Sequence, residues 1–175
     1  MAITRIGGAN AITGTIPAAN VATLTSSNMP TGSVVQVKHG TLGALSTSST
    51  SYSIIGSISI TPTSASNKIF ITYTTHDYIQ NGTTDEWRGC LTQLLRDSTV
   101  ILTDGTNGYG NGAFFAGNTD RTMSYTNHSI VDSPNTTSAI TYQVDGRSRD
   151  SGSPVVFNNS SYGSQGKITV MEIVG

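Results

Sequence analysis

Apolar and polar residues alternate most clearly at the centre of this chain, between positions 57 and 78. Isoleucines alternate with small polar residues up to position 60, and isoleucines and a tyrosine alternate again from 69 to 73. A period of two is typical of half-buried strands. The connection between them is polar and contains Pro62, which lacks the amide that a central strand would use. We therefore predict two antiparallel strands that form the nucleus of a sheet.

Shorter runs of the same kind recur along the chain, separated by clusters of Gly, Asn, Asp, Ser and Pro. The predicted strands lie at 33–39, 52–60, 68–78, 87–96, 100–103, 122–131, 139–147, 155–158 and 167–174, and the polar stretch 41–51 is predicted as a loop. This spacing indicates an all-β sandwich or barrel. We predict an antiparallel, jelly-roll-like β-sandwich, whose strand order the sequence does not determine. The run at 87–96 also has leucines at helical spacing, but Gly89 and Cys90 are poor helix formers, so we assign a strand.

The first 32 residues follow a different pattern, because their apolar residues fit neither a helix face nor a strand face. These residues are Ile3, Ile6, Ile12, Ile16, Val21 and Leu24, set among Gly, Ala, Asn and Thr. Such a segment cannot fold on itself. We predict an extended arm over 1–32 that packs on copies of itself or on a larger assembly, followed by a knob domain over 33–175. A disordered tail is the alternative.

Composition limits the classes of partner. The chain has 175 residues, the size of one domain, with 11% charged residues and a net charge of −1. Scattered Lys and Arg provide no basic patch, so we expect no nucleic-acid partner. No apolar run approaches membrane-spanning length, and we expect no membrane insertion. The single cysteine, Cys90, lies in an apolar run and is predicted to be a small buried residue.

Catalytic and metal-binding patterns are weak. Asp85 and Glu86 beside Trp87 form the best candidate carboxylate pair for glycoside hydrolysis, but solvation of a turn explains them better. The three histidines are isolated, and His76–Asp77 is the one adjacent pair of a histidine and a carboxylate. We therefore expect no enzyme activity, no catalytic residue, no cofactor and no metal site, although three copies meeting on an axis would bring three histidines together.

Aromatic residues in polar loops are the candidate binding groups, because an aromatic face beside Asn or Thr can stack on a sugar ring. The stretch 104–120 is rich in glycine, and a long loop on a rigid β scaffold is a common binding surface. Tyr125 is a further aromatic residue beside a loop. The candidate contact residues are Trp87, Tyr109 and Tyr162, with Asn107 and Asn111 in Asn-Gly turns.

The order of motifs along the chain adds a family resemblance. The motifs are PTGSVVQV at 30–37, ITPTSASNKI at 60–69, LRD at 95–97, IVDSP at 130–134, TYQV at 141–144 and ITVMEIV at 168–174. As an ordered set they resemble the small terminal domains of tail-fibre and related virion surface proteins of marine tailed bacteriophages. The resemblance spans about the whole chain, and the segment before position 25 is similar to the shaft or attachment arms of such proteins.

The resemblance implies a homotrimer of β-sandwich knobs on the virion surface, with the arms near the threefold axis and bound to other virion proteins. Knobs presented outward are expected to contact the host surface, and the aromatic candidate residues are expected to contact a glycan there. The near absence of a shaft leaves an alternative open, a head-decoration or head-fibre protein that docks by its arm. A glycan-binding lectin and a depolymerase are further alternatives.

Overall fold

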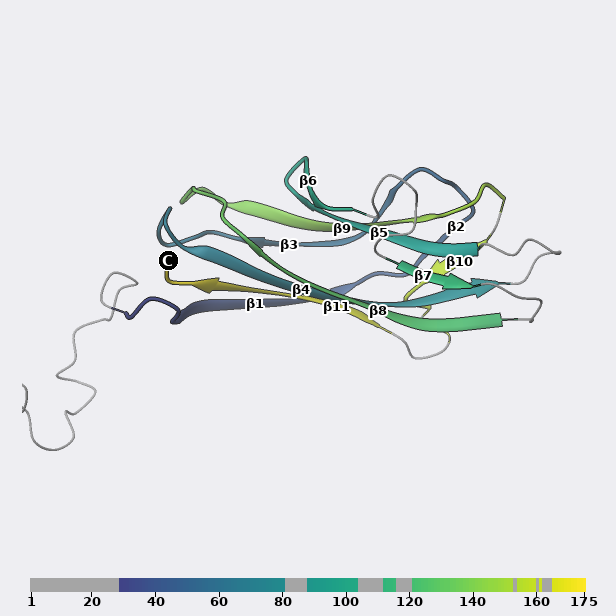
Figure 1. Ribbon diagram of the computed structural model, residues 1–175, viewed down its shortest axis with the longest axis horizontal. Coiled ribbons are helices and arrows are strands. Elements are labelled where there is room, and N and C mark those ends of the chain that lie inside the picture. The colour runs from purple at the N-terminus through teal and green to yellow at the C-terminus, as the bar shows by residue number, and fades with distance from the viewer. Residues whose placement is uncertain are drawn as a thin grey trace, which may run out of the picture.

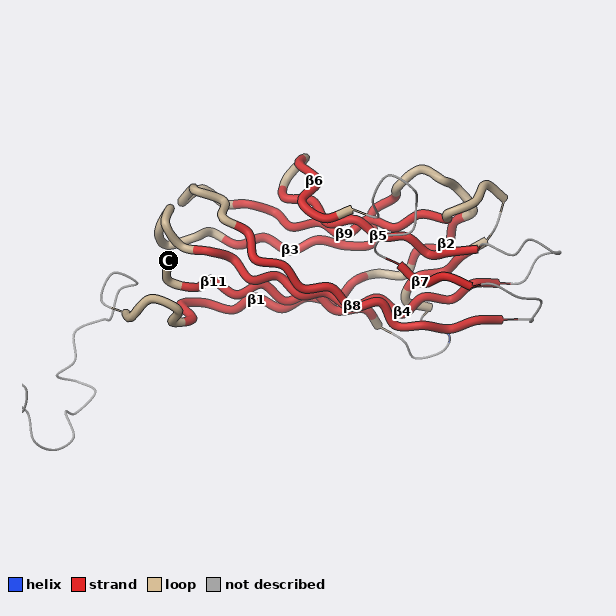
Figure 2. Tube along the Cα trace, viewed as in Figure 1, coloured by secondary structure: helices blue, strands red, loops and turns tan. Residues whose placement is uncertain are grey.

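The computed structural model describes residues 29–80, 88–103, 112–115, 121–152, 154–159, 161 and 165–175, with the backbone alone at 80, 88, 112–115, 121 and 122. These residues form strands arranged in two antiparallel sheets that pack face to face (Figures 1 and 2). The prediction of an all-β sandwich is therefore confirmed. The candidate arm residues Ile3, Ile6, Ile12, Ile16, Val21 and Leu24 lie outside the described residues.

The larger sheet is built around its longest strand, β4. Strand β8 pairs with β4 along its whole length on one side, whereas β11 and β10 share the other side and are flanked by β1 and β2. The sheet is thus four strands wide at both of its ends. Its strands are β1 (Val34–Leu42), β2 (Leu45–Thr47), β4 (Lys68–Gln80), β8 (Arg121–Asp132), β10 (Val155–Phe157) and β11 (Gly166–Ile173).

The smaller sheet has the order β3-β9-β5, and β6 and β7 share the remaining edge of β5. Its strands are β3 (Ser53–Ile60), β5 (Arg88–Arg96), β6 (Thr99–Leu102), β7 (Gly112–Phe115) and β9 (Ile140–Ser148). With β6 and β7 counted as one strand, the two sheets have the orders β1-β11-β4-β8 and β3-β9-β5-β7, in which the chain passes repeatedly from one sheet to the other. This is the strand order of a jelly roll.

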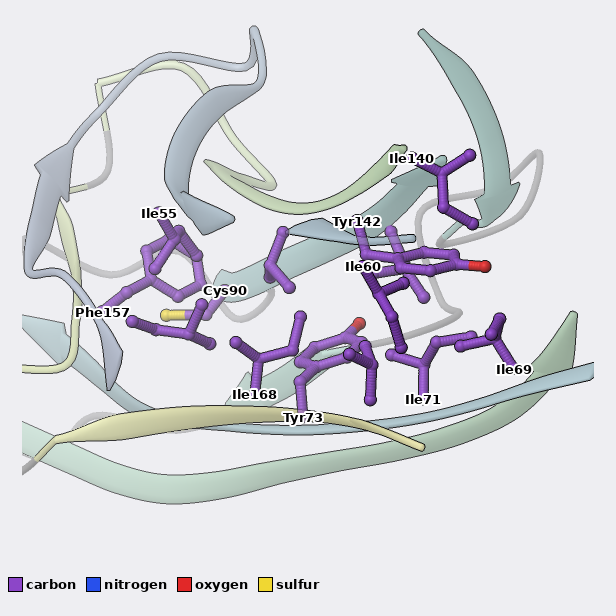
Figure 3. Packing of buried hydrophobic residues seen from close by; sticks show 14 of the residues in the cluster. Ile55, Ile60, Ile69, Ile71, Tyr73, Cys90, Ile140, Tyr142, Phe157 and Ile168 are labelled. Carbon is purple, nitrogen blue, oxygen red and sulfur yellow. The ribbon is translucent and has the colours of Figure 1, made fainter. Parts of the chain in front are cut away.

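The core lies between the two sheets (Figure 3). Ile71 and Tyr73 of the larger sheet meet Ile60 and Tyr142 of the smaller one, and each of these four side chains is almost fully buried. Inward residues recur at every second position because neighbouring strand residues point to opposite faces. Cys90 belongs to this core and is fully buried, as predicted.

Three sequence-based predictions are corrected. Strands β3 and β4 do not pair, because the polar connection between them carries the chain from the smaller sheet to the larger one. The stretch 41–51 is not all loop, since β1 extends to Leu42 and the short β2 pairs with β10. The glycine-rich stretch 104–120 contains β7, which pairs with the first half of β5. The run at 87–96 is a strand, as predicted, from Arg88 to Arg96.

Candidate functional site

One surface of the sandwich stands out, and we call it the outer face. It consists of the side chains of β1, β4, β8 and β11 that point away from the core. Strand register aligns Val37, Met171, Phe70 and Val131 into one row across these four strands. Val37 and Val131 are 53% and 54% exposed, and the other two are partly buried. The row is therefore an apolar strip that water reaches.

The middle of the outer face is polar. The next row contains His39, Thr169, Thr72 and Ser129, joined in pairs by hydrogen bonds of 3.0 Å between His39 Nδ1 and Thr169 Oγ1 and 3.3 Å from Ser129 Oγ to Thr72 Oγ1. Lys167 of the following row donates from Nζ to Thr41 Oγ1 at 2.9 Å. The polar side chains of these two rows are therefore held by hydrogen bonds within the face.

A second apolar group lies further along β8. Tyr125 is 72% exposed, the highest value among the exposed large apolar residues of the described chain, and Met123 beside it is 49% exposed. The ring of His76 is buried and meets the Tyr125 ring edge-on, with centroids 4.8 Å apart. The backbone of His76 is fixed in turn by Asn158, whose Oδ1 accepts from the His76 amide at 2.9 Å. Tyr125 is thus presented from a rigid strand.

The adjacent residues His76 and Asp77 do not form a catalytic pair, because strand alternation puts their side chains on opposite faces of β4. Asp77 points into the core, where it is 1% exposed and accepts a hydrogen bond from Thr126 Oγ1. Burial raises the pKa of Asp77 to about 6, although the Thr126 hydrogen bond lowers it in part. Asp77 is a buried titrating group rather than an accessible one.

The end of the sandwich near the C-terminus is closed by a buried carboxylate, Glu172 of β11. Its Oε1 accepts from Thr63 N at 2.7 Å, Thr63 Oγ1 at 2.8 Å and Asn67 Nδ2 at 2.6 Å, and its Oε2 accepts from Gln36 Nε2 at 2.6 Å. Burial alone would raise the pKa of Glu172, but these hydrogen bonds outweigh it and hold the pKa below its usual range. Glu172 therefore ties β1 and β11 to the connection between the sheets.

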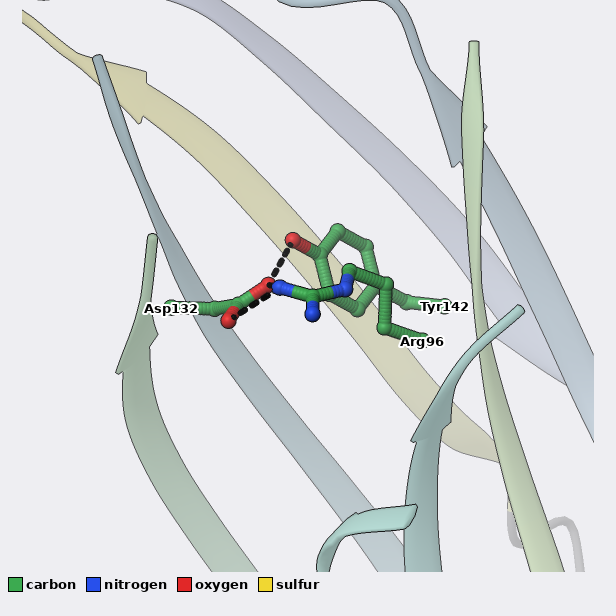
Figure 4. A network of polar contacts seen from close by, with 3 residues as sticks. All are labelled: Arg96, Asp132 and Tyr142. Atoms are coloured by element: carbon green, nitrogen blue, oxygen red, sulfur yellow. Dashed lines mark hydrogen bonds and ion pairs between the residues drawn. The ribbon is translucent and has the colours of Figure 1, made fainter. Parts of the chain in front are cut away.

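A second polar contact joins the sheets near the same end (Figure 4). Arg96 of β5 forms an ion pair with Asp132 of β8, in which Nη1 donates to both carboxylate oxygens at 2.8 and 2.9 Å. The Tyr142 hydroxyl donates to Asp132 Oδ2 at 2.7 Å. Burial and the neighbouring Asp132 carboxylate raise the pKa of Tyr142. Arg96, Asp132 and Tyr142 are bonded to one another across the two sheets, which indicates a structural role.

The candidate contact residues from the sequence all lie outside the described residues: Trp87, Asn107, Tyr109, Asn111 and Tyr162, as do Asp85 and Glu86. Their binding role stays a prediction. The outer face was not recognised from the sequence, although alternation over 123–131 places Met123, Tyr125 and Val131 on one side of a strand.

No group of three or more His, Cys, Asp or Glu side chains in the described part of the chain is arranged to hold a metal ion. The described residues also include no helix with the length and hydrophobicity of a membrane span.

No protein-family model and no curated protein matches the sequence. Among solved structures, the chain is similar to one in the structure of the infectious bursal disease virus Gx strain, with 16% sequence identity and a TM-score of 0.37. The match covers 80% of this chain and 38% of that chain, so this chain spans well under half the length of the protein it matches. A similarity of this extent is no basis for assigning a function.

Proposed function

We propose that this chain is a non-enzymatic virion surface protein, a trimeric knob of tail-fibre type that contacts the host surface. The N-terminal residues anchor each copy to the particle, and the far end of the sandwich is presented outward. Two observations support this role: the order of motifs in the sequence and the separation of the two ends of the sandwich.

The observation that carries it is the separation of the two ends of the sandwich (Figure 1). The chain enters β1 beside its own C-terminus, where Gly32 N donates to Val174 O at 2.9 Å. At the other end of β4, Gln80 pairs with Arg121. The thirteen residues of β4, at about 3.3 Å each, put these ends about 40 Å apart. An anchored N-terminus therefore leaves the other end free to meet a partner.

The fold and the composition agree with this role. Jelly rolls occur in viral capsid proteins and in lectins, an analogy at the level of the fold. Few charges and many Ser, Thr and Asn residues suit an exposed surface that must not bind indiscriminately. A capsid decoration protein would share this geometry, and the position of the protein on the particle distinguishes the two.

Labelling of particles tests the proposal directly. Antibodies raised against the purified full-length chain should label intact virions of the encoding virus in electron micrographs, at the tail tip for an attachment knob and over the head for a decoration protein. Added purified protein should reduce adsorption of the virus to its host, and Trp87→Ala or Tyr109→Ala should weaken this competition. Absence of the protein from purified particles would refute the proposal.

A further inference from the structure

Exposed apolar side chains are concentrated on one side of the molecule. The described part of the chain has seven large apolar residues that are more than 40% exposed. Five of them lie on strands β1 and β8 of the larger sheet: Val34, Val37, Met123, Tyr125 and Val131. The other two, Ile54 and Val100, lie on the smaller sheet. The outer face is therefore the apolar side of this sandwich.

The outward surface of the smaller sheet differs, because much of it is already covered by the chain itself. Leu91, Gln93 and Asp145 point away from the core there and are nevertheless buried. Gln93 Nε2 donates to Asp145 Oδ2 at 3.0 Å, and the Arg147 guanidinium lies 5.1 Å from the centroid of the Tyr52 ring. The outward surface of the smaller sheet is thus partly covered, and Ile54 and Val100 are its exposed large apolar residues in the described part of the chain.

The charges of the outer face also set it apart. The described carboxylates of its strands, Asp77, Asp132 and Glu172, are directed inward and bonded there, so the face has Lys68 and Lys167 as its described charged side chains. Interfaces between proteins are enriched in Tyr and Met and depleted in charged residues at their centres. The outer face shares the exposed Tyr125 and Met123 and the small number of charges, although its middle row is polar.

Its size matches an interface between proteins. Strands β1, β4, β8 and β11 have 9, 13, 12 and 8 residues, and at about 3.3 Å per residue and 4.8 Å between strands they cover roughly 670 Å². A stable interface buries about 800 Å² on each partner. A sheet surface of this area fits another folded surface better than it fits a small ligand, which requires a concave site.

We propose that the outer face is the surface through which copies of this chain associate, with Tyr125 and Val131 buried against a neighbouring copy. The choice of a second copy as the partner rests on the proposed function, in which the knob is a homotrimer. Threefold symmetry then packs the outer face of each copy against a different surface of its neighbour. The face begins at Val34, directly after the segment that anchors each copy, so neighbouring sandwiches held by their N-termini would meet along it. The face thereby supplies the contact that holds the knobs together.

The test measures the mass of the purified full-length protein by light scattering and by native mass spectrometry over a range of concentrations. Wild-type protein should have a multiple of the 18.3 kDa chain mass at low micromolar concentration. Val131→Asp should raise the dissociation constant about 100-fold or more, because it buries an unpaired carboxylate, and Tyr125→Ala should raise it about 10-fold or more. Circular dichroism should show that both variants remain folded.

Val100→Asp is the matched control, because Val100 is a valine on a strand with 45% exposure, but on the smaller sheet. It should leave the mass unchanged. A wild-type monomer at tens of micromolar would overturn the inference, as would an unchanged mass for both outer-face variants. Dissociation by Ile12→Asp with Ile16→Asp in the full chain, but not by Val131→Asp, would assign the association to the N-terminal segment instead. None of these measurements requires virus particles. They therefore test the association of copies independently of the labelling experiment, which tests the virion role.

Discussion

The carboxylate of Glu172 provides the sharpest test of how the sandwich is closed. Replacing it with alanine removes the acceptor for three donor groups: the amide and hydroxyl of Thr63 and the side-chain amide of Asn67, all within 2.8 Å of Oε1. Gln36 Nε2 loses its bond to Oε2 as well but keeps a second acceptor, Thr61 O, at 2.8 Å. The loss therefore falls mainly on the connection between β3 and β4.

The expected magnitude follows from these contacts. A hydrogen bond to a charged group contributes about 1.5–3 kcal/mol, and some of the donors of Glu172 can turn to water when it is removed. We expect Glu172→Ala to lower the free energy of unfolding by about 3–5 kcal/mol. Glu172→Gln keeps an oxygen for Thr63 and Asn67 and places an amide opposite Gln36, so we expect a smaller loss of about 1–2 kcal/mol.

Urea denaturation at pH 7 and at one protein concentration measures both losses, provided that the slope of each transition is unchanged. Because the pKa of Glu172 is lowered in the folded chain, its contribution is present above the unfolded pKa of about 4.5 and is lost as the pH falls further. A loss below about 1 kcal/mol for Glu172→Ala, or equal losses for the two variants, would refute the assignment of Oε1 as the acceptor that closes this end.

Asp77 should make the protein more stable in mild acid: its folded pKa of about 6 exceeds the ordinary value of 3.8, so its contribution is complete below about pH 3.8 and is lost as the pH rises through 6. Between the two ends of this range, the free energy of unfolding of wild type should fall by about 3 kcal/mol relative to that of Asp77→Asn, as measured by denaturation. A difference between the two proteins that does not change with pH would contradict this. Gly166→Ala should destabilise the folded protein by about 1–3 kcal/mol, because the new Cβ would lie 2.5 Å from the buried Asn158 Oδ1. Gly40→Ala should be tolerated, since its Cβ would have contacts of 3.6 Å. Equal melting temperatures for the two variants would disprove this. Cys90 should not react with a thiol reagent until the chain unfolds, because it is fully buried and burial raises its pKa, and rapid labelling of the native protein would show otherwise.

The long strands were predictable because their burial follows the alternation in the sequence. In β11, for example, Ile168 and Val170 point inward between half-buried neighbours, and the same period recurs in β9. Short strands were predictable only in part, since β6 and β10 were expected from the sequence. The three-residue β2 and β7, which has no alternation of apolar and polar residues, were not. Their formation depends on a neighbouring strand that supplies hydrogen bonds, which is a tertiary effect.

The pairing of strands could not be predicted from the sequence, for a related reason. Alternation predicts which side of a strand faces the core but not which strand lies beside it, so β3 and β4 were wrongly expected to pair. The outer face depends on the same missing information. Met171, Phe70 and Val131 are far apart in the chain, and only the register of β11, β4 and β8 brings them into one row.

The pairing of β1 with β11 has a consequence for the order in which the protein is made. The first strand of the sandwich has its hydrogen-bonding partner in the last strand, which a ribosome completes some 130 residues later. Until then β1 has an open edge, and domains dominated by such distant pairings fold slowly. When several chains are synthesised close together, β1 of one chain can meet a finished β11 of another before its own exists. Exchange of this strand between copies is therefore the characteristic folding error to look for in a concentrated preparation.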